Sequence, residues 1–139
     1  MVSPLSTPSV APSLGNYSQA VTVDGPGRWV FMSGQVGVDA NGELQQGFEA
    51  QAHQVWRNIA GVLHDAGMTL ADLVKTTAYV TEAEHLPAHR AIRNEHVGAA
   101  RPAGTLLVVS RLGPPDALIE VEAVAFRAAP AAAGSTTSG

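Results

Sequence analysis

Apolar residues recur with the period of an α-helix in one long segment of the chain. Steps of three and four residues join its apolar positions, which are Phe48, Ala52, Val55, Trp56, Ile59, Val62, Leu63 and Ala66. The spacing predicts one amphipathic helix that stops at Gly67, because glycine readily adopts the left-handed conformation found just past helix ends. The polar face of this helix is expected to carry Gln51, Gln54, Arg57, Asn58 and Asp65.

Runs of strand-forming residues lie on both sides of this helix. Strands are predicted over 17–23, 29–35, 73–80, 105–110 and 118–126. The turn sequence Asp24-Gly25-Pro26-Gly27 joins the first two strands and predicts a hairpin. A second, shorter helix is predicted from near Pro87 to about Val97, since proline is favoured in the first helical turn.

The predicted order of elements, β-β-α-β-α-β-β, indicates an α+β fold. Two helices suffice to cover one face of a single mixed sheet and leave the other face for a partner. The odd positions of the last strand are also all apolar: Ile119, Val121, Ala123 and Ala125. Because one subunit's core does not explain both faces of that strand, a second copy of the chain is expected to cover what remains.

The two ends of the chain differ in composition from its middle. Residues 1–15 are rich in Ser and Pro, and residues 128–139 form an Ala/Gly/Ser/Thr tail without periodicity. Such segments have little to bury. We therefore expect a flexible N-terminal segment, one folded domain over 16–127, and a disordered tail.

Composition argues against several classes of function. The chain has 12 Asp and Glu residues against 8 Lys and Arg residues, and Lys75 is its only lysine, so nucleic acid is not an expected partner. The absence of cysteine excludes disulfides, thiolate metal sites and a thiol nucleophile. No stretch is long and apolar enough for a membrane span, and the start lacks a signal-peptide pattern. A cytoplasmic protein is expected.

Three of the five histidines raise a metal hypothesis. His85 and His89 are four residues apart, and His96 falls near the same helical azimuth. Pro87, however, places His85 ahead of the helix, and a zinc site usually needs three ligands on rigid supports. Solvent-facing histidines, with no metal and no cofactor, are the preferred interpretation. The sequence also lacks a Gly-rich phosphate loop and a Gly-x-Ser-x-Gly elbow.

Several short motifs, in order along the chain, are similar to those of one known family. They are Tyr17-Ser18-Gln19-Ala20, Met32-Ser33-Gly34-Gln35, the helix over 51–67, the strand entry over 72–77, Arg101-Pro102-Ala103-Gly104-Thr105, and Ile119-Glu120-Val121-Glu122-Ala123. Over roughly 16–127 the chain resembles the reactive-intermediate deaminase (RidA/YjgF-like) family. The resemblance implies a chorismate-mutase-like fold, a homotrimer whose sheets line a central barrel, and a small-molecule ligand in each cleft between subunits. It also implies hydrolysis of enamines or imines to ketones and ammonia, without metal or organic cofactor.

The resemblance further implies roles for individual residues. Glu120 stands where the family holds the water that attacks the imine carbon, so it is the expected catalytic residue. The expected substrate-binding positions are Tyr17, Ser33, Gly34, Gly104 and Thr105. The family's ligand-facing asparagine corresponds most nearly to His89. Plainer interpretations stay open, in which Glu120 and Glu122 face solvent, Tyr17 closes the end of the sheet, and Ser33-Gly34 marks a bulge.

At position 104 the chain departs from the family, which has an arginine there that binds the substrate carboxylate. Loss of such a charge-assisted pair removes about 1.5 to 3 kcal/mol, so ordinary α-imino acids are expected to bind poorly. Arg101 lies nearby in sequence but is not assumed to replace the missing cation. With Glu120 and no such arginine, the cleft is expected to be neutral to negative and to prefer a neutral or cationic ligand.

Two classes of function stay open. The first is a cofactor-independent imine or enamine hydrolase whose substrate differs from the family's usual one. The second is a non-catalytic trimer that binds a small ligand or a partner on the same scaffold. An endoribonuclease activity, which some names attach to this family, is disfavoured by the formal net charge of -4 and the single lysine.

Overall fold

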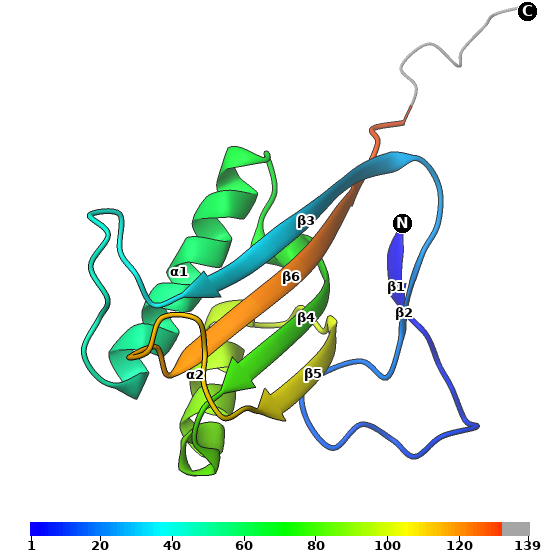
Figure 1. Cartoon of the computed structure of the whole chain (residues 1–139). Coiled ribbons are helices and arrows are strands. Elements are labelled where there is room, and N and C mark those ends of the chain that lie inside the picture. Colours follow the sequence, from blue (N-terminus) through cyan, green and yellow to red (C-terminus); the bar gives the residue numbers. More distant parts are fainter. Residues whose placement is uncertain (132–139) are drawn as a thin grey trace, which may run out of the picture.

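A four-stranded mixed sheet carries two helices on one of its faces (Figure 1). The computed structural model describes residues 1–131 of the chain, so most of the tail predicted over 128–139 lies outside the described residues. In spatial order the strands are β3 (Gly27–Val36), β6 (Ile119–Ala128), β4 (Leu73–Val80) and β5 (Ala103–Val108). β4 and β5 run parallel, and the other neighbours are antiparallel. The predicted α+β fold is confirmed.

The two helices lie close to their predicted bounds. The first, α1, spans Phe48–Asp65, and the second, α2, spans Leu86–Val97. Short 3-10 turns, η1 (Leu70–Asp72) and η2 (Ala83–His85), precede β4 and α2. Within residues 1–131, none of the helices combines the length and the apolar character that crossing a membrane requires.

Gly67 ends α1 in the predicted way. Its φ is 75°, and its N–H donates to the His64 carbonyl at 2.9 Å. The N–H of Met68 donates to the Leu63 carbonyl at 2.8 Å. This pair of bonds satisfies two carbonyls of the last turn and requires a residue that tolerates positive φ.

The hydrophobic core lies between the helices and the sheet. Its largest fully buried side chains come from both layers and include Val55, Trp56, Ile59, Leu63, Val80, Ile119 and Val121. The odd positions of β6 from Ile119 to Ala125 all belong to this core. The interpretation that these positions need a second subunit is therefore wrong, because the helix layer already covers them. Full burial of a larger aliphatic side chain, such as Ile119 or Val121, stabilises the fold by about 1.5–3 kcal/mol.

The opposite face of the sheet presents aromatic and polar side chains to the outside. On β3, Trp29 and Phe31 are 45% and 77% exposed, and their rings stack 6.0 Å apart. On β4, the Tyr79 hydroxyl donates to Glu122 Oε1 at 2.6 Å. Leu107 on β5 is 45% exposed. The helices do not reach this surface (Figure 1), which therefore combines apolar area with hydrogen-bonded polar groups.

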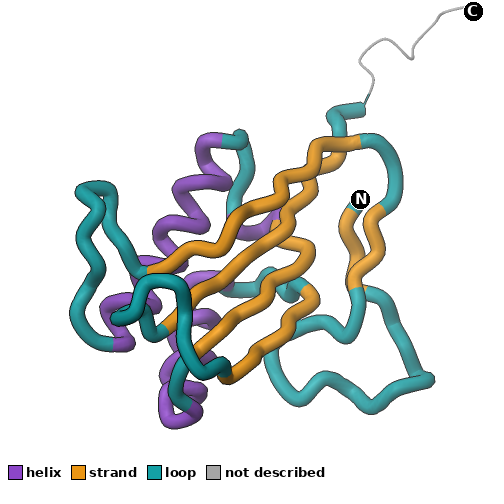
Figure 2. The backbone as a smooth tube through the Cα atoms, in the orientation of Figure 1, coloured by secondary structure: helices purple, strands orange, loops and turns teal. Residues whose placement is uncertain are grey.

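The N-terminal strands pair differently from the prediction. β1 (Val2–Pro4), within the segment over 1–15, pairs antiparallel with β2 (Val21–Val23) in a separate sheet. The predicted hairpin is therefore wrong. β3 pairs with β6 instead, since these two strands of 10 residues align along their length and form a longer ladder than the short β2 could offer. Figure 2 shows the loop between β1 and β2 passing beside β5.

Gln51 connects α1 to two loops. It is 2% exposed, and its Nε2 donates to the carbonyls of Gln45 and Asp116, both at 3.1 Å. Its Oε1 accepts from the Leu118 N–H at 2.8 Å. The prediction that Gln51 lies on the polar face of the helix is wrong, because these partners satisfy the amide inside the protein.

We predict that Gln51→Leu lowers the free energy of unfolding by about 3 kcal/mol, because two carbonyls and one N–H lose their partners while buried. Urea denaturation at a fixed protein concentration measures the loss. The control is Gln54→Leu on the same helix, whose amide donates to Asn58 Oδ1 at 2.8 Å and whose removal costs less than about 1 kcal/mol. Equal losses in the two variants would contradict this role of Gln51.

Candidate functional site

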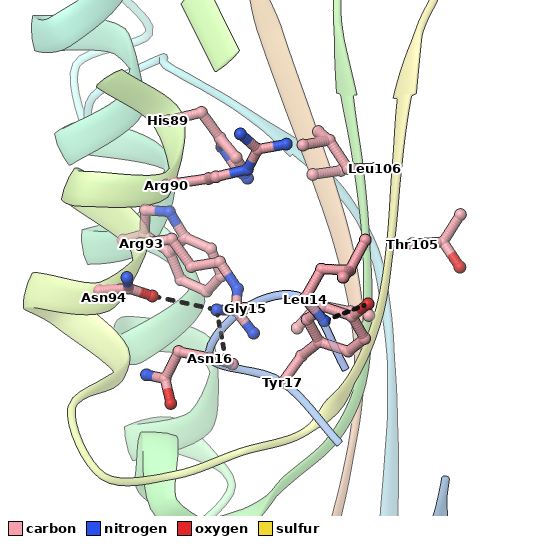
Figure 3. A pocket seen from close by; sticks show the side chains of 14 residues that line it. Leu14, Gly15, Asn16, Tyr17, His89, Arg90, Arg93, Asn94, Thr105 and Leu106 are labelled. Carbon is pink, nitrogen blue, oxygen red and sulfur yellow. Dashed lines mark hydrogen bonds between the residues drawn. The ribbon is translucent and has the colours of Figure 1, made fainter. Parts of the chain in front are cut away.

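A pocket of about 560 Å³ lies between α2, the edge strand β5 and the segment over residues 14–17. Figure 3 shows this pocket, with α2 along one side and β5 along the other. Its lining residues are Leu14, Gly15, Asn16, Tyr17, Trp56, Thr76, Ala78, His89, Arg90, Arg93, Asn94, Gly104, Thr105 and Leu106. Two of the predicted site residues, Tyr17 and Gly104, therefore meet here, and Thr105 borders the pocket.

The N-terminal wall of the pocket is held against β5 by Ser18. Its backbone forms a parallel bridge with Ala103, and its N–H donates to the Pro102 carbonyl at 3.3 Å. Its hydroxyl donates to the Arg101 carbonyl. Tyr17 precedes this anchor, and its hydroxyl accepts from the Leu14 N–H at 3.3 Å, so its ring lines the pocket as part of a fixed turn.

Gly104 faces α2 across the pocket, and Thr105 does not. A side-chain carbon at position 104 would lie 3.7 Å from Thr76 Oγ1 and 4.0 Å from both Arg93 Nη2 and Tyr17 Cβ. The glycine therefore leaves room that a longer side chain would fill. The Thr105 side chain points to the other side of β5 (Figure 3), where its hydroxyl accepts from Lys75 Nζ at 2.6 Å.

Arg93 brings a positive charge to this pocket from α2. Its Nη1 donates to the Asn16 carbonyl at 2.9 Å and to Asn94 Oδ1 at 3.2 Å. Its Nη2 is buried and has no hydrogen-bond partner among the residues that the structure describes. Burial also lowers the pKa of Arg93 below its ordinary value. A guanidinium with one enclosed, unpaired nitrogen is a strong attractor for an anionic oxygen.

The charge of the pocket differs from the expected one. Arg90 and Arg93 both line it, and no Asp or Glu among the described residues does. The expectation of a neutral or negative site that prefers cations is therefore wrong for this pocket, because two arginines of α2 bring positive charge. Arg101 lies elsewhere: it lines a different cavity, and its Nη2 donates at 3.5 Å to the carbonyls of Gly15 and Tyr17.

His89 is a buried wall residue, and the interpretation of a solvent-facing histidine is wrong for it. The side chain is 2% exposed, and its Nδ1 has no partner within residues 1–131. Burial lowers the pKa of His89 to about 4, with a further contribution from the nearby charges of Arg93 and Arg90. The imidazole is therefore neutral at physiological pH and adds polarity to the pocket without charge.

Glu120 and Gly34 form a second group of predicted site residues. β3 bulges between Met32 and Gln35, so Ser33-Gly34 marks a bulge as the plainer interpretation held. A side-chain carbon at Gly34 would lie 2.0 Å from Glu120 Oε2. The carboxylate thus rests against the bulge, and only a glycine leaves it that space.

This second group does not line the pocket of the same chain. Glu120 pairs in register with Tyr79 on β4, and β4 separates it from β5. Glu122 accepts the Tyr79 hydroxyl hydrogen bond, which raises the pKa of Tyr79. One chain therefore holds its predicted site residues in two groups: a cationic pocket at β5 and a carboxylate beside the β3 bulge.

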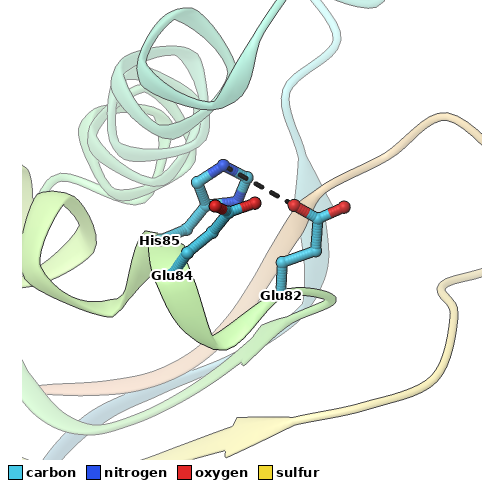
Figure 4. Close-up of side chains that lie close together, drawn as sticks. All are labelled: Glu82, Glu84 and His85. Atoms are coloured by element: carbon cyan, nitrogen blue, oxygen red, sulfur yellow. Dashed lines mark ion pairs between the residues drawn. The ribbon is translucent and has the colours of Figure 1, made fainter.

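The histidines do not gather as the metal hypothesis required. His53 Nδ1 and His96 Nε2 lie 2.8 Å apart, whereas His85 stacks on Phe48 at 4.3 Å. Among residues 1–131, the grouping with ligand atoms close enough for a metal is Glu82, Glu84 and His85 (Figure 4). A hydrogen bond that protonated Glu82 donates to Glu84 raises the pKa of Glu82, so these exposed carboxyls already interact with each other.

Comparisons with known proteins agree on one family. The sequence profile described as Endoribonuclease L-PSP matches residues 8–127. A RutC family protein of Pyrococcus abyssi is 37% identical over 116 residues, which cover 82% of this chain and 88% of the relative. A 2-iminobutanoate/2-iminopropanoate deaminase of Salmonella typhimurium is 34% identical, with 88% of this chain and 96% of the relative covered. The crystal structure of the Rid family protein YyfB of Yersinia pestis, described as of unknown function, superposes with a TM-score of 0.81 at 35% identity, covering 91% of this chain and 98% of that one.

We predict that acid destabilises the protein through His89. The unfolded chain binds a proton near pH 6.5, but the folded chain does so only near pH 4, so stability falls as pH decreases across this interval. The slope is about 1.4 kcal/mol per pH unit, or about 3 kcal/mol in total. In His89→Gln this contribution is absent, so the difference in unfolding free energy between wild type and variant should shift by that amount between pH 7 and 4. Parallel pH profiles would contradict the burial of a neutral imidazole.

Proposed function

The chain belongs to the reactive-intermediate deaminase (RidA/YjgF-like) family, and on that basis we propose that it is a cofactor-independent hydrolase of imines or enamines. Water adds to the carbon of the C=N bond, and the carbinolamine formed loses ammonia to leave a ketone. No electrons are exchanged with another molecule. The name of the Salmonella relative supports this reaction class.

The observation that carries the proposal is the approach of the Glu120 carboxylate to the bulge at Gly34. In the proposed step Glu120 takes a proton from water while the water oxygen bonds to the imine carbon. Glu120 then gives this proton to the nitrogen, which also receives the hydroxyl proton of the carbinolamine and leaves as ammonia, so that the ketone remains. A general base held in place by the surrounding backbone typically contributes about 10²–10⁴-fold to the rate.

We place this step in a cleft between copies of a homotrimer. Two observations support the assembly. The exposed Trp29 and Phe31 on the sheet face opposite the helices form an apolar surface suited to burial. Glu120 also lies outside the pocket of its own chain, so a neighbouring copy is needed to bring such a carboxylate to the pocket opening.

The proposed substrate is bulkier than the 2-imino acids in the relative's name. Gly104 leaves open the room where the family has a long side chain, and the pocket measures about 560 Å³. Leu14, Tyr17 and Leu106 contribute apolar lining. Apolar walls with a few fixed polar groups are typical of sites for small organic molecules. Binding RNA instead is disfavoured by the formal net charge of -4.

We predict faster hydrolysis of the imine derived from leucine than of the imine derived from 2-aminobutyrate. Each imine is generated in situ by an amino-acid oxidase, and the imine that escapes hydrolysis is trapped by semicarbazide. The protein should lower the trapped amount and release ammonia earlier than buffer does. Tight binding of keto acids without any acceleration would favour the non-catalytic alternative.

Glu120→Gln and Gly34→Ala should both lower this hydrolysis at least about 10²-fold. The first removes the base, and the second forces the carboxylate away, because the new methyl would lie 2.0 Å from Oε2. The matched control is Glu122→Gln, two positions along β6 and bonded to Tyr79. A trimeric, folded Gly34→Ala protein with full activity would contradict the role assigned to the bulge.

We predict that Phe31→Glu prevents trimer formation. Phe31 is 77% exposed in one chain, so the substitution should leave the subunit folded, but a partner that covers the ring cannot accommodate the charge. Light scattering at micromolar concentration should give three times 14.3 kDa for the wild type and a smaller mass for the variant. His64→Glu, on the helix side with 89% side-chain exposure, is the control. A monomeric wild type would contradict the proposal.

A further inference from the structure

We infer that Arg93, together with Arg90, forms the anion-binding part of the pocket and holds the carboxylate of a 2-oxo or 2-imino acid from α2 instead of from position 104. The inference deepens the proposed function and rests on it for the identity of the ligand. Three features of the described residues support this inference.

The Arg93 guanidinium lies close to Gly104. Nη2 lies 4.0 Å from where a side-chain carbon at Gly104 would stand. The positive charge of Arg93 therefore lies next to Gly104, the β5 position at which this chain has no arginine. Because Nη2 borders the space above Gly104, an anion bound to it shares this space with the rest of the ligand.

The two terminal nitrogens of this guanidinium differ in their hydrogen bonds. Nη1 is fixed by the Asn16 carbonyl and by Asn94, whereas Nη2 is enclosed and lacks an acceptor within the described part of the chain. A buried donor left unpaired destabilises the protein, and the cost is larger when the donor is charged. A carboxylate oxygen bound at Nη2 recovers this cost and restores the pKa that burial lowers.

The side chains around Arg93 add positive charge and polarity to the pocket. Arg90 lies three residues before Arg93 on the same side of α2 and reaches toward β5 (Figure 3). The buried His89 in the same pocket wall has its Nδ1 without a partner among residues 1–131. Within the part of the chain that the structure describes, no acidic side chain lines the pocket. Two cations and one neutral imidazole thus converge on a site that lacks a counterion.

The test is calorimetric titration of the full chain with 4-methyl-2-oxopentanoate, the keto acid that corresponds to leucine. Arg93→Ala should weaken binding at least tenfold, and Arg90→Ala should weaken it several-fold. Arg93→Lys should recover part of the loss, since it keeps the charge without the planar fork. The affinity of the wild type should fall with added salt, and this salt dependence should be largely lost in Arg93→Ala. A merely structural role of Arg93 would not change the salt dependence.

Arg57→Ala is the matched control, because this exposed arginine of α1 carries the same charge but does not line the pocket. Gly104→Arg alone should bring little gain, since its side chain must pass the like charge of Arg93. Arg93→Ala combined with Gly104→Arg should restore binding. If the double variant folds but does not regain binding, positions 93 and 104 do not bind the same anion. That result would overturn the claim that Arg93 takes the place of an arginine at position 104.

Further outcomes separate this inference from the proposed function. Unchanged affinity in Arg93→Ala, or an equal loss of affinity in Arg57→Ala, overturns the inference even if imines are hydrolysed. Inorganic phosphate that binds as tightly as the keto acid would reveal a general anion site and would overturn the assignment to carboxylic acids. Binding that depends on Arg93 without imine hydrolysis would uphold the anion site and refute the hydrolase proposal.

Discussion

The fold depends on one constraint: its helices cover only one face of the four-stranded sheet. The helix layer buries the odd positions of β6 and leaves Glu120 and Glu122 on the other face. The same alternation on β5 turns Gly104 toward α2 and Thr105 away from it. Strand parity therefore determines which side chains can line the pocket of their own chain and which can meet another copy.

Within that frame, Gly104 and Arg93 form a complementary pair. A glycine on β5 makes room, and a guanidinium from α2 lies beside that room at 4.0 Å. The family resemblance shows that position 104 lacks an arginine. It does not point to Arg93, because Arg93 lies on α2 and Gly104 lies on β5. The enclosed Nη2 of Arg93 and the neutral His89 give the pocket a polarity that favours an anion over the cation expected from position 104 alone.

Local patterns predicted the elements well because they depend on nearest neighbours. The helical stripe, its end at Gly67 and the strand over 73–80 all appear as expected. The hairpin failed because β3 finds its longest partner at the far end of the chain. The polar-face prediction fails at Gln51 because two of its three partners, Asp116 and Leu118, lie in a loop far along the chain. Arg90 and Arg93 are three residues apart on α2, the helix that also carries His89. This spacing is the sequence feature that indicates a positively charged pocket.

The most direct test of the central claim is a crystal structure of the protein with 4-methyl-2-oxopentanoate bound. Our account predicts both carboxylate oxygens within hydrogen-bond distance of guanidinium groups on α2, with at least one on Arg93 Nη2. The alkyl group should lie above Gly104, and a Glu120 from a neighbouring copy should face the keto carbon. A keto acid bound away from α2, with Nη2 of Arg93 still unpaired, would contradict it.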